Sequence, residues 1–93
     1  MIINPTSRAA SIVAERDRVV AALRDGGWRL PQAQGNFVWL PLLARSEAFA
    51  AACARRGFTV RAFPGEGVRV TIAEPAANDL FLATALSRER WSM

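Results

Sequence analysis

Two short stretches rich in β-branched and aromatic residues, joined by a Pro-Gly turn, constrain the fold of this chain most strongly. The first covers residues 57–63, the turn covers residues 64–67 (Pro-Gly-Glu-Gly), and the second covers residues 68–72. This pattern predicts two β-strands connected by a loop. Side chains alternate along a strand, so Arg69 is expected on the face opposite an apolar one. An arginine in the middle of a strand is well placed to bind a carboxylate or a phosphate, which makes Arg69 a candidate binding residue.

The remainder of the chain predicts three helices and a further strand. Residues 8–25 carry apolar side chains on roughly one face and stop at Gly26-Gly27, which predicts a helix. Arg16 interrupts the apolar stripe, which indicates that one end of this helix packs against something other than the core of this domain. The almost wholly apolar run over residues 36–40 is typical of a strand buried on both faces, and Pro41 ends it.

Two shorter helices complete the pattern. One is expected over residues 47–56, with Ser46 as its N-terminal cap and Gly57 at its C-terminus. The other opens at Glu74-Pro75, with proline at a position where no amide is missed. The buried face of this last helix is expected to contain Phe81, Leu82, Ala85 and Leu86. The predicted order is α-β-α-β-β-α, a small, mainly antiparallel sheet covered by helices, which is an α+β fold. Since 93 residues have room for one core, residues 1–93 are expected to form a single domain.

Missing residue types exclude several kinds of chemistry. All 12 basic residues are arginine, so the chain has no lysine to form a Schiff base and no histidine to act as a base or metal ligand. The single cysteine, Cys53, lies in an Ala-rich helical segment and is expected to be a small buried hydrophobe without a disulfide partner. The acidic residues fall on predicted helix surfaces. We therefore do not expect catalysis by this chain alone.

The formal net charge of +4 raises the question of nucleic-acid binding. The arginines are scattered along the chain, mostly beside acidic residues or alanines on predicted helices, so solvated helix faces explain them better than a nucleic-acid partner does. No apolar run reaches the length of a membrane span, and residues 1–5 do not have the pattern of a signal peptide. These observations favour a cytoplasmic location without a membrane partner.

Four segments in register closely resemble the C-terminal small domain of fold type I aminotransferases, which depend on pyridoxal phosphate (PLP). The nearest subgroup is the histidinol-phosphate and aromatic amino acid aminotransferases. These enzymes carry an NFV strand, a G-x-x-V-R strand, a V-R-[IV]-T-[IV]-G strand and an E-N-D-x-F-L helix start, in that order. The matching segments of this chain are Gly35–Leu40, Gly57–Arg61, Gly67–Ile72 and Asn78–Leu82. The resemblance covers about residues 8–90, which correspond to about the last quarter of such an enzyme.

This resemblance implies a role for each arginine of the two strands. In the family, the arginine of the V-R-x-T strand forms a forked ion pair with the α-carboxylate of the amino acid substrate, and by position that residue is Arg69. The arginine of the preceding strand, here Arg61, is implied to lie near the distal end of the substrate and, in phosphate-using members, to help bind the phosphate. The implied reaction transfers an amino group between an amino acid, aromatic or histidinol-phosphate-like, and a 2-oxo acid. Asn36 and Phe37 are expected to be structural.

Two departures from the family pattern bear on activity. Ala73 stands where the family usually has glycine after the T-I pair. The catalytic lysine, the phosphate-holding loop and the aspartate that contacts the pyridine nitrogen all belong to the family's large domain, which this sequence does not contain. The chain is therefore expected to be a C-terminal domain or fragment that contributes substrate-binding arginines, binds no PLP by itself and is inactive without the large domain.

Other interpretations of the same residues stay open. Arg69 is alternatively an edge-strand arginine paired with Glu66 or Glu74, or is simply solvated, and Arg61 is alternatively solvated. Phe58, Val60 and the tryptophans fit packing better than ligand binding. A chain derived from the aminotransferase fold is alternatively a stand-alone module that binds a small anion or a protein. The fragment interpretation predicts an apolar patch on the first helix and the sheet, where the large domain packs.

Overall fold

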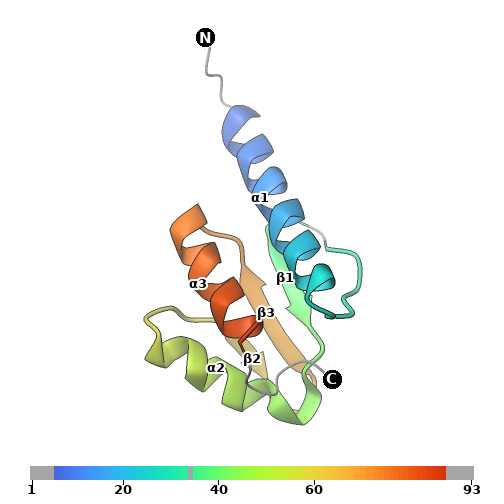
Figure 1. Ribbon diagram of the computed structural model, residues 1–93, viewed down its shortest axis with the longest axis vertical. Coiled ribbons are helices and arrows are strands. Elements are labelled where there is room, and N and C mark those ends of the chain that lie inside the picture. Colours follow the sequence, from blue (N-terminus) through green and yellow to red (C-terminus); the bar gives the residue numbers. More distant parts are fainter. Residues whose placement is uncertain (1–5, 34, 88–93) are drawn as a thin grey trace.

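A computed structural model describes residues 6–33 and 35–87 of the chain (Figure 1). The elements follow the predicted order, with one short 3₁₀ helix added before the second α-helix. They are α1 (Thr6–Asp25), β1 (Phe37–Leu40), the 3₁₀ helix η1 (Leu43–Arg45), α2 (Ser46–Arg55), β2 (Arg61–Phe63), β3 (Gly67–Thr71) and α3 (Pro75–Ala85). The α+β fold class predicted from the sequence is therefore confirmed.

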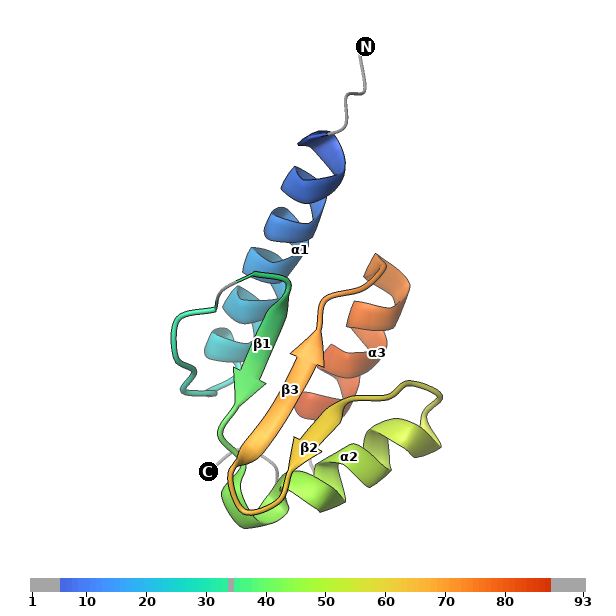
Figure 2. The same cartoon turned by 180° about the vertical axis from the view of Figure 1, so that it is seen from behind.

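The three strands form one antiparallel sheet in the order β1-β3-β2, with β3 at its centre. The helices lie on one side of this sheet, and the view from behind shows the opposite side of the strands without a covering layer (Figures 1 and 2). The prediction that the first strand is buried on both faces is therefore wrong. Val38 and Leu40 are buried, whereas Phe37 is 37% exposed and Trp39 is partly buried, because only one face of the sheet meets the helices.

The strand predicted over residues 57–63 is shorter than expected and begins at Arg61. Gly57 has φ +94°, and the amides of Gly57 and Phe58 donate to the carbonyls of Ala54 and Cys53 in the last turn of α2. This is the hydrogen-bond pattern of a glycine-terminated helix, so these two amides are committed to the end of α2 and do not pair with β3. The end of α1 is built in the same way, with the stop at Gly26-Gly27 as predicted.

The core lies between the sheet and the helices. Phe49 of α2 and Phe81 of α3 are its largest fully buried side chains, and their rings meet edge to face with centroids 6.2 Å apart. The indole nitrogen of Trp28 donates to the Ala85 carbonyl at 3.2 Å, so the ring is buried with its donor satisfied. The predicted burial of Phe81, Leu82 and Ala85 is confirmed. The predicted burial of Leu86 is wrong, because Leu86 follows the last helical residue and is 42% exposed.

Two helix starts differ in how well the sequence predicted them. The last helix begins at Pro75 after Glu74, as expected. Ser46 is the first residue of α2 rather than its cap, and its hydroxyl donates to the carbonyl of Leu43 at 2.7 Å. The 3₁₀ helix in front of α2 places that carbonyl within reach. The Ser46 hydroxyl therefore donates to this preceding residue and does not accept from the free amides of α2.

A polar network ties α1 to the start of α3. Arg18 donates to both carboxylate oxygens of Glu15 at 2.9 and 2.8 Å, which confirms the surface pair expected from their spacing, and also to Asp79 at 2.9 Å. The buried Asn78 donates to Glu15 and to the Ala73 carbonyl and accepts from the Ala73 amide. The donors Arg18 and Asn78 hold the pKa of Glu15 at about 2.

In the described residues, no helix is both long enough and apolar enough to cross a membrane.

Candidate functional site

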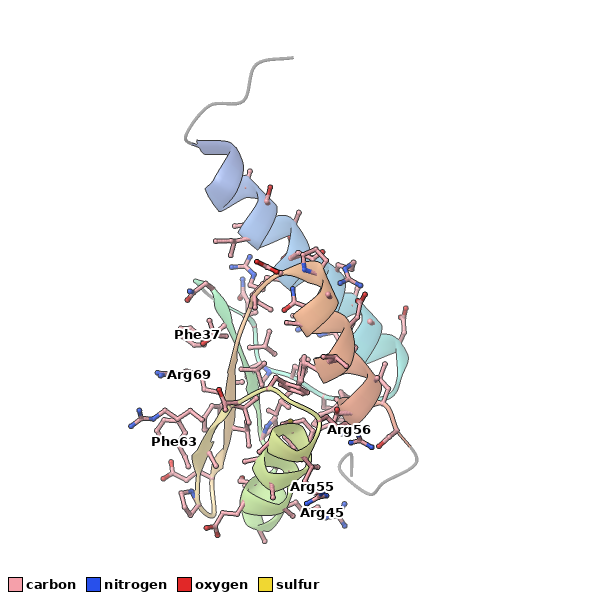
Figure 3. The ribbon with its side chains drawn as sticks, turned by 90° about the vertical axis from the view of Figure 1, so that its left-hand side faces the viewer. Phe37, Arg45, Arg55, Arg56, Phe63 and Arg69 are labelled. Atoms are coloured by element: carbon pink, nitrogen blue, oxygen red, sulfur yellow. The ribbon has the colours of Figure 1, made fainter. Side chains whose placement is uncertain are left out.

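The face of the sheet that points away from the helices carries the two candidate arginines. Alternation along the strands puts Arg61 and Phe63 of β2, Arg69 of β3, and Phe37 and Trp39 of β1 on this side, which we call the open face. Figure 3 shows Phe37, Arg69 and Phe63 projecting from the sheet on the side opposite the helices. The structure therefore brings Arg61 and Arg69 together, as their positions on neighbouring strands predict.

Arg61 and Arg69 are direct cross-strand partners, and both side chains are exposed. Like charges directly opposite each other destabilise an antiparallel pair, so this placement does not serve the stability of the sheet. The alternative in which Arg69 lies on an edge strand is wrong, because β3 is the central strand. No ion pair within 4.0 Å joins Arg69 or Arg61 to an acidic residue among residues 6–33 and 35–87.

Each arginine instead lies against an aromatic ring. The guanidinium carbon of Arg69 lies 5.7 Å from the ring centroid of Phe37, and that of Arg61 lies 5.4 Å from the ring centroid of Phe63. Both distances fall within the range of about 6 Å in which a cation is attracted to a ring face. A ring face attracts a guanidinium through its charge and not by accepting a hydrogen bond. The N–H groups of both arginines therefore stay available for an anion.

Trp39 and Phe63 form an aromatic surface at one end of the open face. Their ring centroids are 5.5 Å apart, at an interplanar angle of 58°. The indole lies over Gly67, where a Cβ atom would come within 2.4 Å of Trp39 Cζ2 and 2.5 Å of the Leu40 carbonyl oxygen. Glycine is therefore required at position 67 for the indole to cross β3 and reach Phe63.

Sequence reasoning missed the aromatic members of this site. The sequence predicts a structural role for Phe37 and a packing role for the tryptophans, and neither prediction singles out Phe37 or Trp39 for this face. The packing role is confirmed for Trp28, which is 6% exposed in the core. The alternation of residues 37–40 contained the signal, because one edge strand of an antiparallel sheet presents every second side chain to each face. Phe58 and Val60 do fit packing, since both are partly buried against the core.

The N-terminal half of α1 also exposes an apolar side chain. Val13 is 42% exposed, and open hollows lie on both sides of this part of the helix, one beside Gly35-Asn36 and the other beside residues 72–75. Arg16, which interrupts the apolar stripe, donates to the Gly35 carbonyl at 2.9 Å and so joins α1 to the loop before β1. The exposed Val13 of α1 and Phe37 of β1 agree with the apolar patch expected on the first helix and the sheet.

Other chemistry is limited in the described part of the chain. Cys53 is fully buried, and burial raises the pKa of its thiol to about 12, so it is not a nucleophile at neutral pH. Among residues 6–33 and 35–87, no group of three or more histidine, cysteine or acidic side chains is arranged to hold a metal ion. The open face, with its two arginines, is the strongest candidate site.

Known proteins resemble this chain in sequence and in fold. No protein-family model matches the chain. It is 57% identical over 75 residues to the aromatic amino acid aminotransferase of Streptomyces avermitilis. These 75 residues make up 81% of this chain and 21% of that enzyme. It is 49% identical over 87 residues to the aromatic amino acid aminotransferase of Rhodococcus jostii, which covers 94% of this chain and 24% of that enzyme.

The fold comparison agrees with the sequence comparison. A crystal structure of a "putative aminotransferase" from Burkholderia pseudomallei superposes with a TM-score of 0.73 at 29% identity, over 83% of this chain and 25% of that one. The chain thus spans about a fifth to a quarter of the length of the relatives that it matches. By sequence and by fold, this chain is related to the aminotransferases and corresponds to one small part of such an enzyme.

Proposed function

We propose that this chain is the small domain of a PLP-dependent aminotransferase and supplies the arginines that bind the amino acid and 2-oxo acid substrates. The observation that carries the proposal is the open face, where two arginines stand side by side with no acidic partner in the described part of the chain. Two like charges placed opposite each other without an acidic partner are expected at a functional site rather than at a structural one. The aminotransferase relatives support the same conclusion.

Arg69 is proposed to bind the α-carboxylate of the substrate. It lies on the central strand, which is hydrogen-bonded to a neighbour on each side, so its backbone is held more firmly than that of an edge strand or a loop. A planar guanidinium matches a carboxylate with two parallel hydrogen bonds. Arg61 is proposed to lie near the distal end of the substrate, since it projects from the adjacent strand on the same face.

The residues of this chain do not fit PLP as a cofactor by themselves. PLP enzymes hold the cofactor covalently through a lysine amine, and this chain contains no lysine. We therefore assign substrate binding to the chain, and no bond-making step. The lysine and the cofactor belong in this proposal to a large domain, and the apolar surface around Val13 and Phe37 is where that domain packs.

A hybrid enzyme tests this proposal. The 75-residue segment of the Streptomyces avermitilis enzyme that matches this chain is replaced by the corresponding residues of this chain, and transamination of aromatic amino acids is measured. The hybrid is expected to be active. Arg69→Ala is expected to lower kcat/KM by about 100-fold or more, because it leaves a buried substrate carboxylate without its partner, a loss of about 3–5 kcal/mol.

Arg55→Ala is the matched control. Arg55 is an exposed arginine on α2 and lies on the helix side of the sheet, away from Arg69 (Figure 3). This variant is expected to keep kcat/KM within about twofold, as is usual for a surface substitution. Equal losses in the Arg55 and Arg69 variants, or an active hybrid indifferent to Arg69, would contradict the proposal.

A second candidate function is a stand-alone module that binds a small anion. The observation in its favour is that both arginines and their aromatic neighbours are assembled entirely within this chain. Titration of the isolated chain with amino acids and phosphorylated metabolites, followed by NMR, distinguishes the two functions. Binding of one amino acid or phosphorylated metabolite at Arg61 and Arg69 much more tightly than inorganic phosphate supports the module, and binding no tighter than that of inorganic phosphate supports the small-domain proposal.

A further inference from the structure

The close pairing of two like charges on the open face raises the question of what holds them in place. Arg61 and Arg69 are directly opposite each other in the β2–β3 register. Two guanidinium groups that extended straight outward from these positions would repel each other, or would share one anion between them. The contacts made by their ends show a different arrangement.

The two aromatic partners lie at opposite ends of the sheet. Phe37 is opposite Thr71, two residues beyond Arg69 toward the end of β3, and its ring attracts the Arg69 guanidinium. Phe63 is opposite Gly67, two residues before Arg69, and its ring attracts the Arg61 guanidinium. Figure 3 shows Phe37 and Phe63 on either side of Arg69 along the strands. Although Arg61 and Arg69 are directly opposite each other, their side chains therefore extend toward opposite ends of the sheet.

Trp39 prevents Arg69 from leaning toward the other end. Trp39 is the cross-strand partner of Arg69 on β1, and its indole crosses over Gly67 to contact Phe63. The space beside β3 at the Gly67 end is thus filled by the indole. Arg69 is left with the Phe37 end of the open face.

We propose that Phe37 and Phe63 are positioning residues that hold the guanidinium groups of Arg69 and Arg61 apart, so that the open face offers two separate anion subsites. Each subsite has one guanidinium over one ring and binds one anionic group. The proposed function already assigns the α-carboxylate to Arg69 and the distal end of the substrate to Arg61, and the two rings are inferred to keep these positions apart. The positioning itself does not depend on that function, because all of the contacts lie within this chain.

The proposal is tested by NMR on the isolated chain. In the unsubstituted chain, the δ-protons of Arg69 are expected to show nuclear Overhauser contacts to the ring of Phe37, and those of Arg61 to the ring of Phe63. Phe37→Leu is expected to move the side-chain signals of Arg69 toward their random-coil positions and leave those of Arg61 in place. Phe63→Leu is expected to do the reverse, so each variant is the control for the other. Phe37→Tyr keeps a ring face and is expected to restore the Arg69 signals.

Titration with inorganic phosphate tests the separation of the subsites. The signals of Arg61 and Arg69 are expected to follow two different binding curves, and Arg61→Ala is expected to change the dissociation constant read at Arg69 by less than about twofold, as for independent sites. One shared curve that collapses in Arg61→Ala would overturn the proposal. So would Overhauser contacts between the two arginine side chains, or a Phe37→Leu variant that shifts both arginines equally. An inactive hybrid enzyme would count against the proposed function and would leave these results unchanged.

Discussion

The covered face and the open face of the sheet are made by the same three strands, yet they are built on different principles. On the covered face, Val38, Leu40, Val68 and Val70 are at most 4% exposed and pack against the helices. On the open face, neighbouring positions carry two arginines and three aromatic side chains that remain wholly or partly exposed. The covered face is explained by burial of apolar surface, which is the main driving force of folding. The open face is not explained in this way.

The difference shows how one strand serves stability and function at once. Val68 and Val70 secure β3 to the core, so the intervening Arg69 is held rigidly without contributing to the core itself. Substitutions on the two faces are therefore expected to have opposite profiles. Changes on the covered face lower stability, and changes to the exposed arginines of the open face alter binding with little change in stability.

The largest expected effect is on the covered side. Phe81→Ala removes a ring that is 2% exposed and that contacts Phe49 and Phe58. It is expected to lower the free energy of unfolding by about 3–5 kcal/mol, measured by urea denaturation followed by circular dichroism. Phe37→Ala, on the open face, is the comparison and is expected to cost less than half as much. Equal costs would remove the distinction between the two faces.

A smaller effect is expected beneath the Trp39 indole on the open face. Gly67→Ala places a methyl group against the Trp39 indole and the Leu40 carbonyl, so strand and ring must shift. We expect a loss of about 1–3 kcal/mol in the same denaturation experiment. The cost is expected to fall in a Trp39→Ala background, because the ring that clashes is absent. An unchanged cost there would mean that the backbone contact alone forbids a side chain at this position.

The polar network between α1 and α3 makes the stability of the covered side depend on pH. The pKa of Glu15 is lowered to about 2 in the folded chain from 4.5, chiefly by the hydrogen bonds from Arg18. A lowered folded-state pKa contributes stability above about pH 4.5, and this contribution is lost as the pH falls through about 2. The difference in Tm between the unsubstituted chain and Glu15→Gln is therefore expected to shrink from pH 5 to pH 2. A constant difference over this range would contradict the assignment.

The smallest effect is expected from the arginine pair itself. Arg61→Gln relieves the repulsion from Arg69 and removes one cation–ring contact, so its effect on the free energy of unfolding is expected to stay within about 0.5 kcal/mol. Arg55→Gln on α2 serves as the control for loss of a surface charge. A cost above about 1 kcal/mol for Arg61→Gln alone would show that the open face is structural after all.

Much of the fold was predictable because its signals are local. Gly26-Gly27 and Gly57 end their helices, Glu74-Pro75 begins the last one, and the Pro-Gly turn joins β2 to β3. Such signals act through a few neighbouring φ/ψ angles and amides, so they survive in the sequence alone. The errors at Ser46, Leu86 and residues 57–60 are errors of helix and strand ends, where a single hydrogen bond to a distant or preceding residue decides the outcome. Trp91, which is expected from the sequence to fold back over the end of the last helix, lies outside the described residues.

The sequence by itself determined the α+β order, the strand that carries Arg69, and the absence of lysine that limits what this chain does. The tertiary structure decided which strand is central, which face of the sheet stays open, and which ring lies beside each arginine. These depend on register between segments about 30 residues apart, and register is set by long-range packing against the helices rather than by local propensity. That is why Arg69 could be proposed as a binding residue from its own strand, while the position of the Phe37 ring beside its guanidinium could be seen only in the folded chain.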